Sequence, residues 1–175
     1  MKHYIHLTLI SMKNNSLRAL FLAIAVFCFA LVAGAYWFQH GPQQQQPCPL
    51  CILQRYAYLG IGFVALLGAV HGPAVIGRRI YAALMALFAA AGVGFTVWQL
   101  SKGDTMQSCL SDPVGEFVQS LPSAQWFEGK LFFATGGCAD KYPPTFGLSL
   151  VAWSLICFSA LLIISIAIAL RAKTK

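Results

Sequence analysis

Apolar residues in this chain gather into four long runs that carry almost no charge. Each run has about the twenty residues that a helix needs to cross the hydrocarbon core of a bilayer. The expected spans are about 19–38, 53–71, 80–100 and 146–170. Gly72 and Pro73 end the second run early, so this span depends on including residues near Leu53. The pattern predicts an all-α fold, a polytopic membrane protein whose single domain, 1–175, is a four-helix transmembrane bundle.

Between the third and fourth runs, residues 101–145 form the one sizeable segment outside the membrane. Asp112 followed by Pro113 is typical of a helix start, which predicts a short surface helix over about 113–121 in this loop. Further on, the stretch 131–133 is too apolar for a loop that stands free in water. It either lies on the membrane surface or packs against the ends of the spanning helices, and both interpretations stay open.

The composition indicates lipid surroundings, because apolar residues make up 58 % of the chain and charged residues only 10 %. Ordinary globular proteins carry roughly 25 % charged residues. The formal net charge of +7 would suit a nucleic-acid ligand, but the positions of the charges exclude that interpretation. Lys and Arg cluster beside the ends of the spans, at 2, 13, 18, 78, 79, 171, 173 and 175. All five acidic residues lie between the third and fourth spans.

Short segments rich in Lys and Arg stay in the cytoplasm. We therefore expect both termini and residues 72–79 inside, and the loops 39–52 and 101–145 in the periplasm. Four of the six cysteines then fall on the outer side: Cys48, Cys51, Cys109 and Cys138. Their number fits a compartment in which disulfides form and persist. The remaining two, Cys28 and Cys157, lie within spans and are expected to be small packing residues.

Residues 47–55, Pro-Cys-Pro-Leu-Cys-Ile-Leu-Gln-Arg, put two cysteines three apart where a polar loop meets the second apolar run. Pro49 suits the first position of a helix, where its missing N–H costs nothing. In that register Cys51 is the third helical residue, and Arg55 lies one turn further on the same face. The positive end of the helix dipole and the guanidinium both favour the thiolate, the reactive form of cysteine. The stretch predicts a reactive thiol pair at the N-terminal end of a membrane-spanning helix.

Four kinds of site could use the outer cysteines. A zinc site needs four convergent ligands, usually in two close pairs, and only Cys48 and Cys51 have that spacing, so we expect no metal. Covalent haem needs a histidine after the second cysteine, where this chain has Ile52. Static disulfides account easily for Cys109 and Cys138, but a disulfide across three residues restrains little of the unfolded chain. A redox relay, in which a reducible C-x-x-C pair works with a second outer pair, fits best.

With these residues in place, the chain resembles the bacterial disulfide bond formation protein B (DsbB) family over essentially its whole length. The most specific match is Pro-Cys-x-x-Cys followed by Arg four residues after the second cysteine, here Cys48, Cys51 and Arg55. The resemblance implies a multi-pass enzyme of the bacterial inner membrane, with its redox sites on the periplasmic side. Such an enzyme is a protein-dithiol:quinone oxidoreductase. It reoxidises a periplasmic thioredoxin-fold protein of the DsbA kind and passes the electrons to ubiquinone or menaquinone.

Carried over by position, the resemblance implies two redox-active disulfides, Cys48–Cys51 and Cys109–Cys138. The reduced partner would attack Cys109, and the freed Cys138 would attack Cys48. Cys51 would then be left as a thiolate that faces the quinone, with Arg55 beside it as a quinone-binding residue. The helix register gives Cys51 and Arg55 compatible roles independently, since a cation suits quinone oxygens on which negative charge develops.

Two positions depart from the family pattern. Several members have a His or Arg near the outer end of the third span, where residues 94–99 read Gly-Phe-Thr-Val-Trp-Gln. Gln99 is the candidate for that place, as a hydrogen-bond donor to the quinone, and the alternative for it is a plain interfacial residue. The family often has an acidic residue before the arginine, and here Gln54 stands in that position.

Two other functions stay open from the sequence. One is an enzyme similar to vitamin K epoxide reductase, which also pairs C-x-x-C with a four-helix bundle. That family carries its C-x-x-C late in the chain, whereas Cys48 and Cys51 open the second span. The other is a structural four-span membrane protein with static extracytoplasmic disulfides and no turnover, whose four outer cysteines would stay oxidised in mild thiol.

Overall fold

A computed structural model of the chain describes residues 2–41, 44, 46–72, 74–102, 113–122, 131–136 and 147–171, with the backbone alone for 2–14 and 102. These described residues form four long helices and one short one: α1 (Lys2–His40), α2 (Pro49–His71), α3 (Val75–Lys102), α4 (Pro113–Ser120) and α6 (Leu150–Arg171). The stretches able to cross a membrane are Asn15–His40, Pro49–His71, Val75–Ser101 and Leu150–Arg171. The predicted all-α class with four spanning helices is confirmed.

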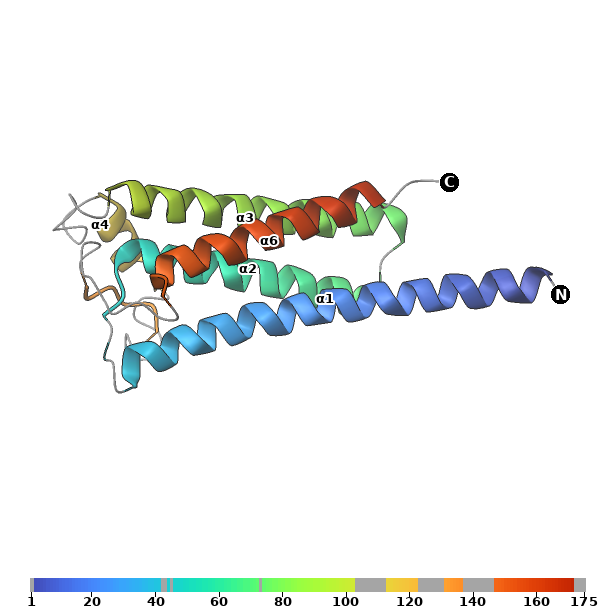
Figure 1. Cartoon of the computed structure of the whole chain (residues 1–175), viewed down its shortest axis with the longest axis horizontal. Coiled ribbons are helices and arrows are strands. Elements are labelled where there is room, and N and C mark those ends of the chain that lie inside the picture. Colours follow the sequence, from blue (N-terminus) through green and yellow to red (C-terminus); the bar gives the residue numbers. More distant parts are fainter. Residues whose placement is uncertain are drawn as a thin grey trace.

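The long helices run side by side as an elongated bundle (Figure 1). α1 packs against α2, α2 against α3, and α3 against α6. The first turns of α1, the last turns of α6 and the turn between α2 and α3 lie at one end of the bundle (Figure 1). α4 and the chain before α2 lie at the other end, which is the separation that the charge pattern requires of the loops.

The outer faces of the bundle are apolar. Side chains that are more than half exposed there include Val26, Phe63, Val70, Leu87, Ile163 and Leu170. A soluble protein rarely leaves so much apolar surface uncovered, so these faces suit lipid. The interior is closely packed around Phe21, Ile61, Met85 and Phe158, each at most 1 % exposed. Cys28 is fully buried in the same core, as expected of a packing residue.

α2, which carries the C-x-x-C pair, begins and ends as the sequence predicts. Cys48 is the extended residue before the helix, and Pro49 is the first helical residue. The Cys51 amide donates a hydrogen bond of 3.3 Å to Cys48 Sγ, so the cysteine side chain acts as the N-cap. At the other end Gly72 has φ of 54°, the left-handed conformation that favours glycine, and its amide bonds the carbonyl oxygen of Gly68 at 3.1 Å.

A second, smaller core joins α4 and residues 131–136 to the start of α2. It contains Ile52, Val118, Phe132 and Ala134. The ring of Phe132 stacks on Tyr56 with centroids 4.8 Å apart. Phe132 therefore packs against the end of a spanning helix, which was one of the two interpretations of this stretch. α4 is the predicted short surface helix, while its expected cap, Asp112, lies outside the described residues.

The small residues of α3 do not act alike. A Cβ at Gly92 would lie 2.4 Å from the Phe158 ring of α6, so glycine permits the close approach of these two helices. A Cβ at Gly94 would meet nothing within 4 Å. Gly94 therefore takes no part in this helix contact, because residues two apart on a helix point in different directions.

Candidate functional site

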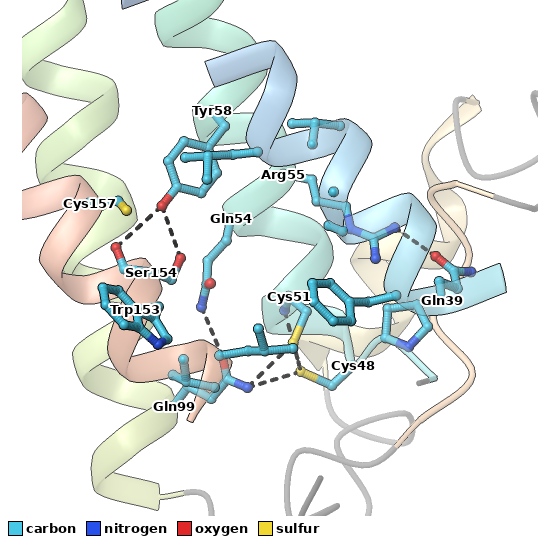
Figure 2. A pocket seen from close by; sticks show the side chains of 18 of the residues that line it. Gln39, Cys48, Cys51, Gln54, Arg55, Tyr58, Gln99, Trp153, Ser154 and Cys157 are labelled. Atoms are coloured by element: carbon cyan, nitrogen blue, oxygen red, sulfur yellow. Dashed lines mark hydrogen bonds between the residues drawn. The ribbon is translucent and has the colours of Figure 1, made fainter. Parts of the chain in front are cut away.

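Cys48 and Cys51 meet at the first turn of α2, with their sulfurs close together (Figure 2). Both are free thiols, and their Sγ atoms lie 2.8 Å apart and share a hydrogen bond. This hydrogen bond and the burial of the sulfur raise the pKa of the Cys48 thiol. Cys48 therefore stays protonated more readily than an ordinary thiol. Only a small movement would bring the two sulfurs to the distance of a disulfide bond, about 2.05 Å.

Two glutamines from neighbouring helices lie beside the thiol pair, and one of them donates hydrogen bonds to both sulfurs (Figure 2). Gln99 of α3 points its amide nitrogen at both sulfurs, 3.3 Å from Cys48 Sγ and 3.4 Å from Cys51 Sγ. Its amide oxygen accepts a 2.8 Å hydrogen bond from Gln54 Nε2 of α2. Both glutamines are only 6 % exposed. The pair thus aims a fixed N–H donor at the sulfurs, which favours negative charge on them.

Arg55 brings a full positive charge to the same helix turn while being only 7 % exposed. Its Nη1 donates to the side-chain oxygen of Gln39 at 2.8 Å and to the carbonyl oxygen of Leu131. Both of these acceptors are neutral. Among the described residues, the ionisable groups that act on the guanidinium are the thiols of Cys51 and Cys48. A buried cation with these surroundings favours an anion beside it, such as a thiolate or a ligand oxygen.

A cavity of about 320 Å³ adjoins these residues. Its volume is at the lower end of the range of small-molecule sites. Apolar side chains of α1 and α6 form opposite walls, and polar groups of α2 and α3 converge between them: Cys51, Gln54, Arg55 and Gln99. Residues of α1 and α6 thus both line the cavity, while further along the bundle the two helices contribute to one core. An apolar chamber with a few convergent donors is typical of a ligand site.

Further along α2, a second polar group lines the same cavity. The hydroxyl of Tyr58 lies 3.1 Å from Ser154 Oγ and 3.3 Å from the Ser154 carbonyl oxygen, both on α6. Its ring stacks on Phe158, with centroids 4.0 Å apart and an interplanar angle of 12°. Cys157 also lines this end of the cavity, is partly buried and packs against the main core, as expected of a packing residue.

Residues 131–136 are joined to the chain just before Cys48 by backbone hydrogen bonds. The amides of Thr135 and Gly136 both donate to the carbonyl oxygen of Pro47, each at 3.1 Å. A Cβ at Gly136 would lie 2.5 Å from the carbonyl oxygen of Gln46, so the two chains approach this closely only because the residue is glycine. Residues 135 and 136 therefore lie against the two residues that precede Cys48.

The structure brings together several of the residues that the sequence singled out and leaves others undescribed. Cys48, Cys51, Arg55 and Gln99 all line one cavity. The other two candidate cysteines, Cys109 and Cys138, lie outside the described residues.

Sequence reasoning missed four polar contributors, namely Gln39 as a partner of Arg55, Gln54 as the partner of Gln99, Tyr58 and Ser154. For Gln54 a signal was present, because it follows Cys51 by three residues and shares its helix face. No local signal marks Tyr58 or Ser154, since their contact depends on how α2 and α6 are placed.

Comparison with known proteins gives one consistent family. The family described as disulfide bond formation protein DsbB matches residues 17–168. A disulfide bond formation protein B of Burkholderia ambifaria is 40 % identical over 148 residues, covering 83 % of this chain and 85 % of the relative. One of Cupriavidus necator is 39 % identical over 165 residues, covering 94 % of this chain and 98 % of the relative. The similarity therefore includes all four spanning helices.

Proposed function

The chain belongs to the DsbB family of disulfide bond formation proteins, and on that premise we propose that it is a membrane thiol:quinone oxidoreductase. It reoxidises a periplasmic dithiol oxidase of the DsbA kind and passes the electrons to a membrane quinone, ubiquinone or menaquinone. The observation that carries the proposal is that the C-x-x-C sulfurs and the buried Arg55 share one apolar-walled cavity inside a membrane bundle.

The residues of the cavity fit a quinone ring. Its apolar walls suit the ring faces, and the Gln99 amide and the Arg55 guanidinium are donors for a ring oxygen that gains negative charge. When bound, a quinone supplies an acceptor for two electrons and two protons. Residues of both α1 and α6 line the cavity, and in the proposal a ligand dissolved in the bilayer enters between these two helices.

In the proposed reaction the reduced Cys48 and Cys51 give up two electrons and two protons and close a disulfide. Cys51, in the first helical turn, loses its proton first and faces the ring as a thiolate. Arg55 and the Gln99 amide stabilise that negative charge. Cys48 keeps its proton longer, because the hydrogen bond to Cys51 raises the pKa of its thiol. Its sulfur then bonds to Cys51 as the disulfide forms.

Delivery of electrons to this pair runs through the large outer loop. In the proposal the DsbA-like partner attacks the Cys109–Cys138 disulfide at Cys109, and the released Cys138 attacks Cys48 and displaces Cys51 as a thiolate. The second thiol of the partner then releases Cys109, which attacks Cys138, so that the Cys109–Cys138 disulfide forms again and Cys48 and Cys51 are left reduced. The docking of Gly136 on Pro47 supports the attack on Cys48, because only Gly137 separates Gly136 from Cys138, a reach of about 7 Å when the chain is extended. The transfer thus needs only a short movement of chain beside Cys48.

The proposed location is the bacterial inner membrane, with the cysteine turn on the periplasmic side. The first turns of α3, with Arg78 and Arg79, and the last turn of α6, with Arg171, lie at the opposite end of the bundle (Figure 1). Since such segments stay in the cytoplasm, both termini are assigned there. The periplasm then supplies the oxidising surroundings in which the four outer cysteines work.

Quinone reduction by the purified protein in detergent tests the proposal. Reduced DsbA-like protein is the electron donor, and wild type is compared with Cys51→Ser and Arg55→Ala. The proposal predicts turnover in wild type, none in Cys51→Ser and slower turnover in Arg55→Ala. Absence of quinone reduction in wild type, with its disulfides unchanged by the donor, would refute the oxidase and support a structural protein with static disulfides.

A further inference from the structure

The cavity has a polar group at each end, and the proposed reaction uses only one of them. Cys51, Arg55 and Gln99 form the first group. Tyr58 lies seven residues after Cys51, about 10 Å further along the axis of α2. Its hydroxyl lies against Ser154 across the cavity, and both residues line it (Figure 2).

We propose that the Tyr58 hydroxyl, held in place by Ser154, binds the quinone oxygen that lies farther from Cys51. This positions the ring so that its other oxygen faces Cys51 and Arg55. The inference rests on the proposed function, which it extends to a second quinone-binding end. Tyr58 is a positioning residue in this proposal and takes no part in moving electrons.

The need for such a group follows from the chemistry of a para-quinone. The ring has two carbonyl oxygens on opposite edges, and an acceptor buried without a hydrogen bond costs free energy. When one oxygen lies at the Cys51 end, the other points along the cavity between apolar walls such as Val32 and Leu150. Tyr58 is the donor that lines this part of the cavity from α2, and it is 6 % exposed.

The contacts of Tyr58 leave its proton available to a ligand. Its ring is fixed by the stack on Phe158, so the position of the hydroxyl is set. Ser154 Oγ, 3.1 Å away, can act as donor or acceptor in this contact. When Ser154 donates to the phenol oxygen, the Tyr58 proton is free to turn from the Ser154 carbonyl oxygen to the quinone.

Binding of two ligands to the purified full-length protein in detergent tests the inference. The probes are a decyl-substituted benzoquinone, with two ring oxygens, and the matching decylcyclohexenone, with one. Equilibrium dialysis gives the Kd of each for wild type and for Tyr58→Phe, which keeps the ring stack and removes the hydroxyl. In Tyr58→Phe we expect the Kd of the benzoquinone to rise roughly three- to tenfold, which corresponds to the loss of one hydrogen bond. The Kd of the cyclohexenone should change little.

Tyr81→Phe is the matched control, because the Tyr81 hydroxyl lies 3.4 Å from His71 Nδ1 at the far end of α2. It should bind both probes as wild type does. Ser154→Ala provides a second variant, which should weaken benzoquinone binding less than Tyr58→Phe. In turnover, Tyr58→Phe should raise the KM for quinone more than it lowers kcat.

The outcomes separate this inference from the proposed function. An unchanged Kd of Tyr58→Phe for benzoquinone, or an equal loss for both probes, would overturn the positioning role and leave the oxidase intact. The equal loss would mean that Tyr58 only joins α2 to α6. A wild-type protein that neither binds nor reduces benzoquinone would overturn both.

Discussion

The side-chain amide of Gln54 donates a 2.8 Å hydrogen bond to the amide oxygen of Gln99, and this contact fixes which end of Gln99 faces the thiols. With its oxygen occupied, Gln99 presents its nitrogen to Cys48 and Cys51. The two glutamines thus work as one donor directed at sulfur.

Replacement of Gln99 should slow electron transfer from the thiol pair. Gln99→Leu removes the N–H donor from both sulfurs, so we expect quinone reduction to fall about fivefold, the value of one hydrogen bond. Gln54→Leu should give a smaller decrease, because Gln99 remains but is no longer oriented. Steady-state quinone reduction measures both. Thr96→Val is the control, since the Thr96 hydroxyl bonds the carbonyl oxygen of Gly92 within α3; equal rates in Gln99→Leu and this control would contradict the role.

Gly136 should control transfer between the two cysteine pairs. Gly136→Val would place side-chain atoms against the Gln46 carbonyl oxygen, which is already 2.5 Å from the position of a Cβ. The segment must then move away from Pro47, and we expect reduction by the DsbA-like donor to slow severalfold. The control is the single-turnover reaction of prereduced Cys48 and Cys51 with quinone, which should keep its rate. A normal rate with the donor would show that this docking is not needed.

The Arg55→Lys variant should keep only part of the quinone-reducing activity. A lysine keeps the charge near Cys51 but cannot reproduce the planar guanidinium contacts with Gln39 and Leu131. We expect Arg55→Lys to raise the KM for quinone and to retain more activity than Arg55→Ala. Gln39→Leu separates the two effects, because it removes one contact and leaves the charge. Equal activity of the lysine and alanine variants would show that the charge itself contributes little.

Gly92 and Gly94 form a matched pair for stability. Gly92→Ala would place a Cβ 2.4 Å from the Phe158 ring, so we expect the free energy of unfolding to fall by about 1–3 kcal/mol. Gly94→Ala meets nothing within 4 Å and should be neutral or slightly stabilising, because alanine favours the helix. Thermal unfolding in the same detergent measures both variants. A lower midpoint for Gly94→Ala than for Gly92→Ala would contradict the packing of α3 on α6.

The parts of the fold that depend on local chemistry were predictable from the sequence. Length and hydropathy define four spans, because a bilayer requires about twenty apolar residues. The start of α2 at Pro49 follows from the properties of proline, and its end at Gly72 from those of glycine. The α4 helix at Pro113 follows in the same way. Each of these features depends only on neighbouring residues.

The parts that depend on how helices are placed were not predictable. Gln99 was a weak candidate because nothing in the sequence says which face of α3 meets Cys51. Tyr58 and Ser154 lie far apart in the chain, and their contact needs the relative rotation of α2 and α6. The same rotation separates Gly92 from Gly94. A single sequence shows which residues share a helix face, but it does not show which faces of different helices pack against each other.

The central claim is that Cys48 and Cys51 pass two electrons to a quinone in the adjoining cavity. A single-turnover experiment without oxygen tests it most directly, with a Cys109→Ala/Cys138→Ala variant that is fully reduced and then freed of reductant. After addition of a benzoquinone we expect one quinol per protein and the loss of two thiols, with a disulfide mapped to Cys48–Cys51. Formation of no quinol, or loss of thiols at Cys28 or Cys157 with Cys48 and Cys51 still reduced, would contradict it.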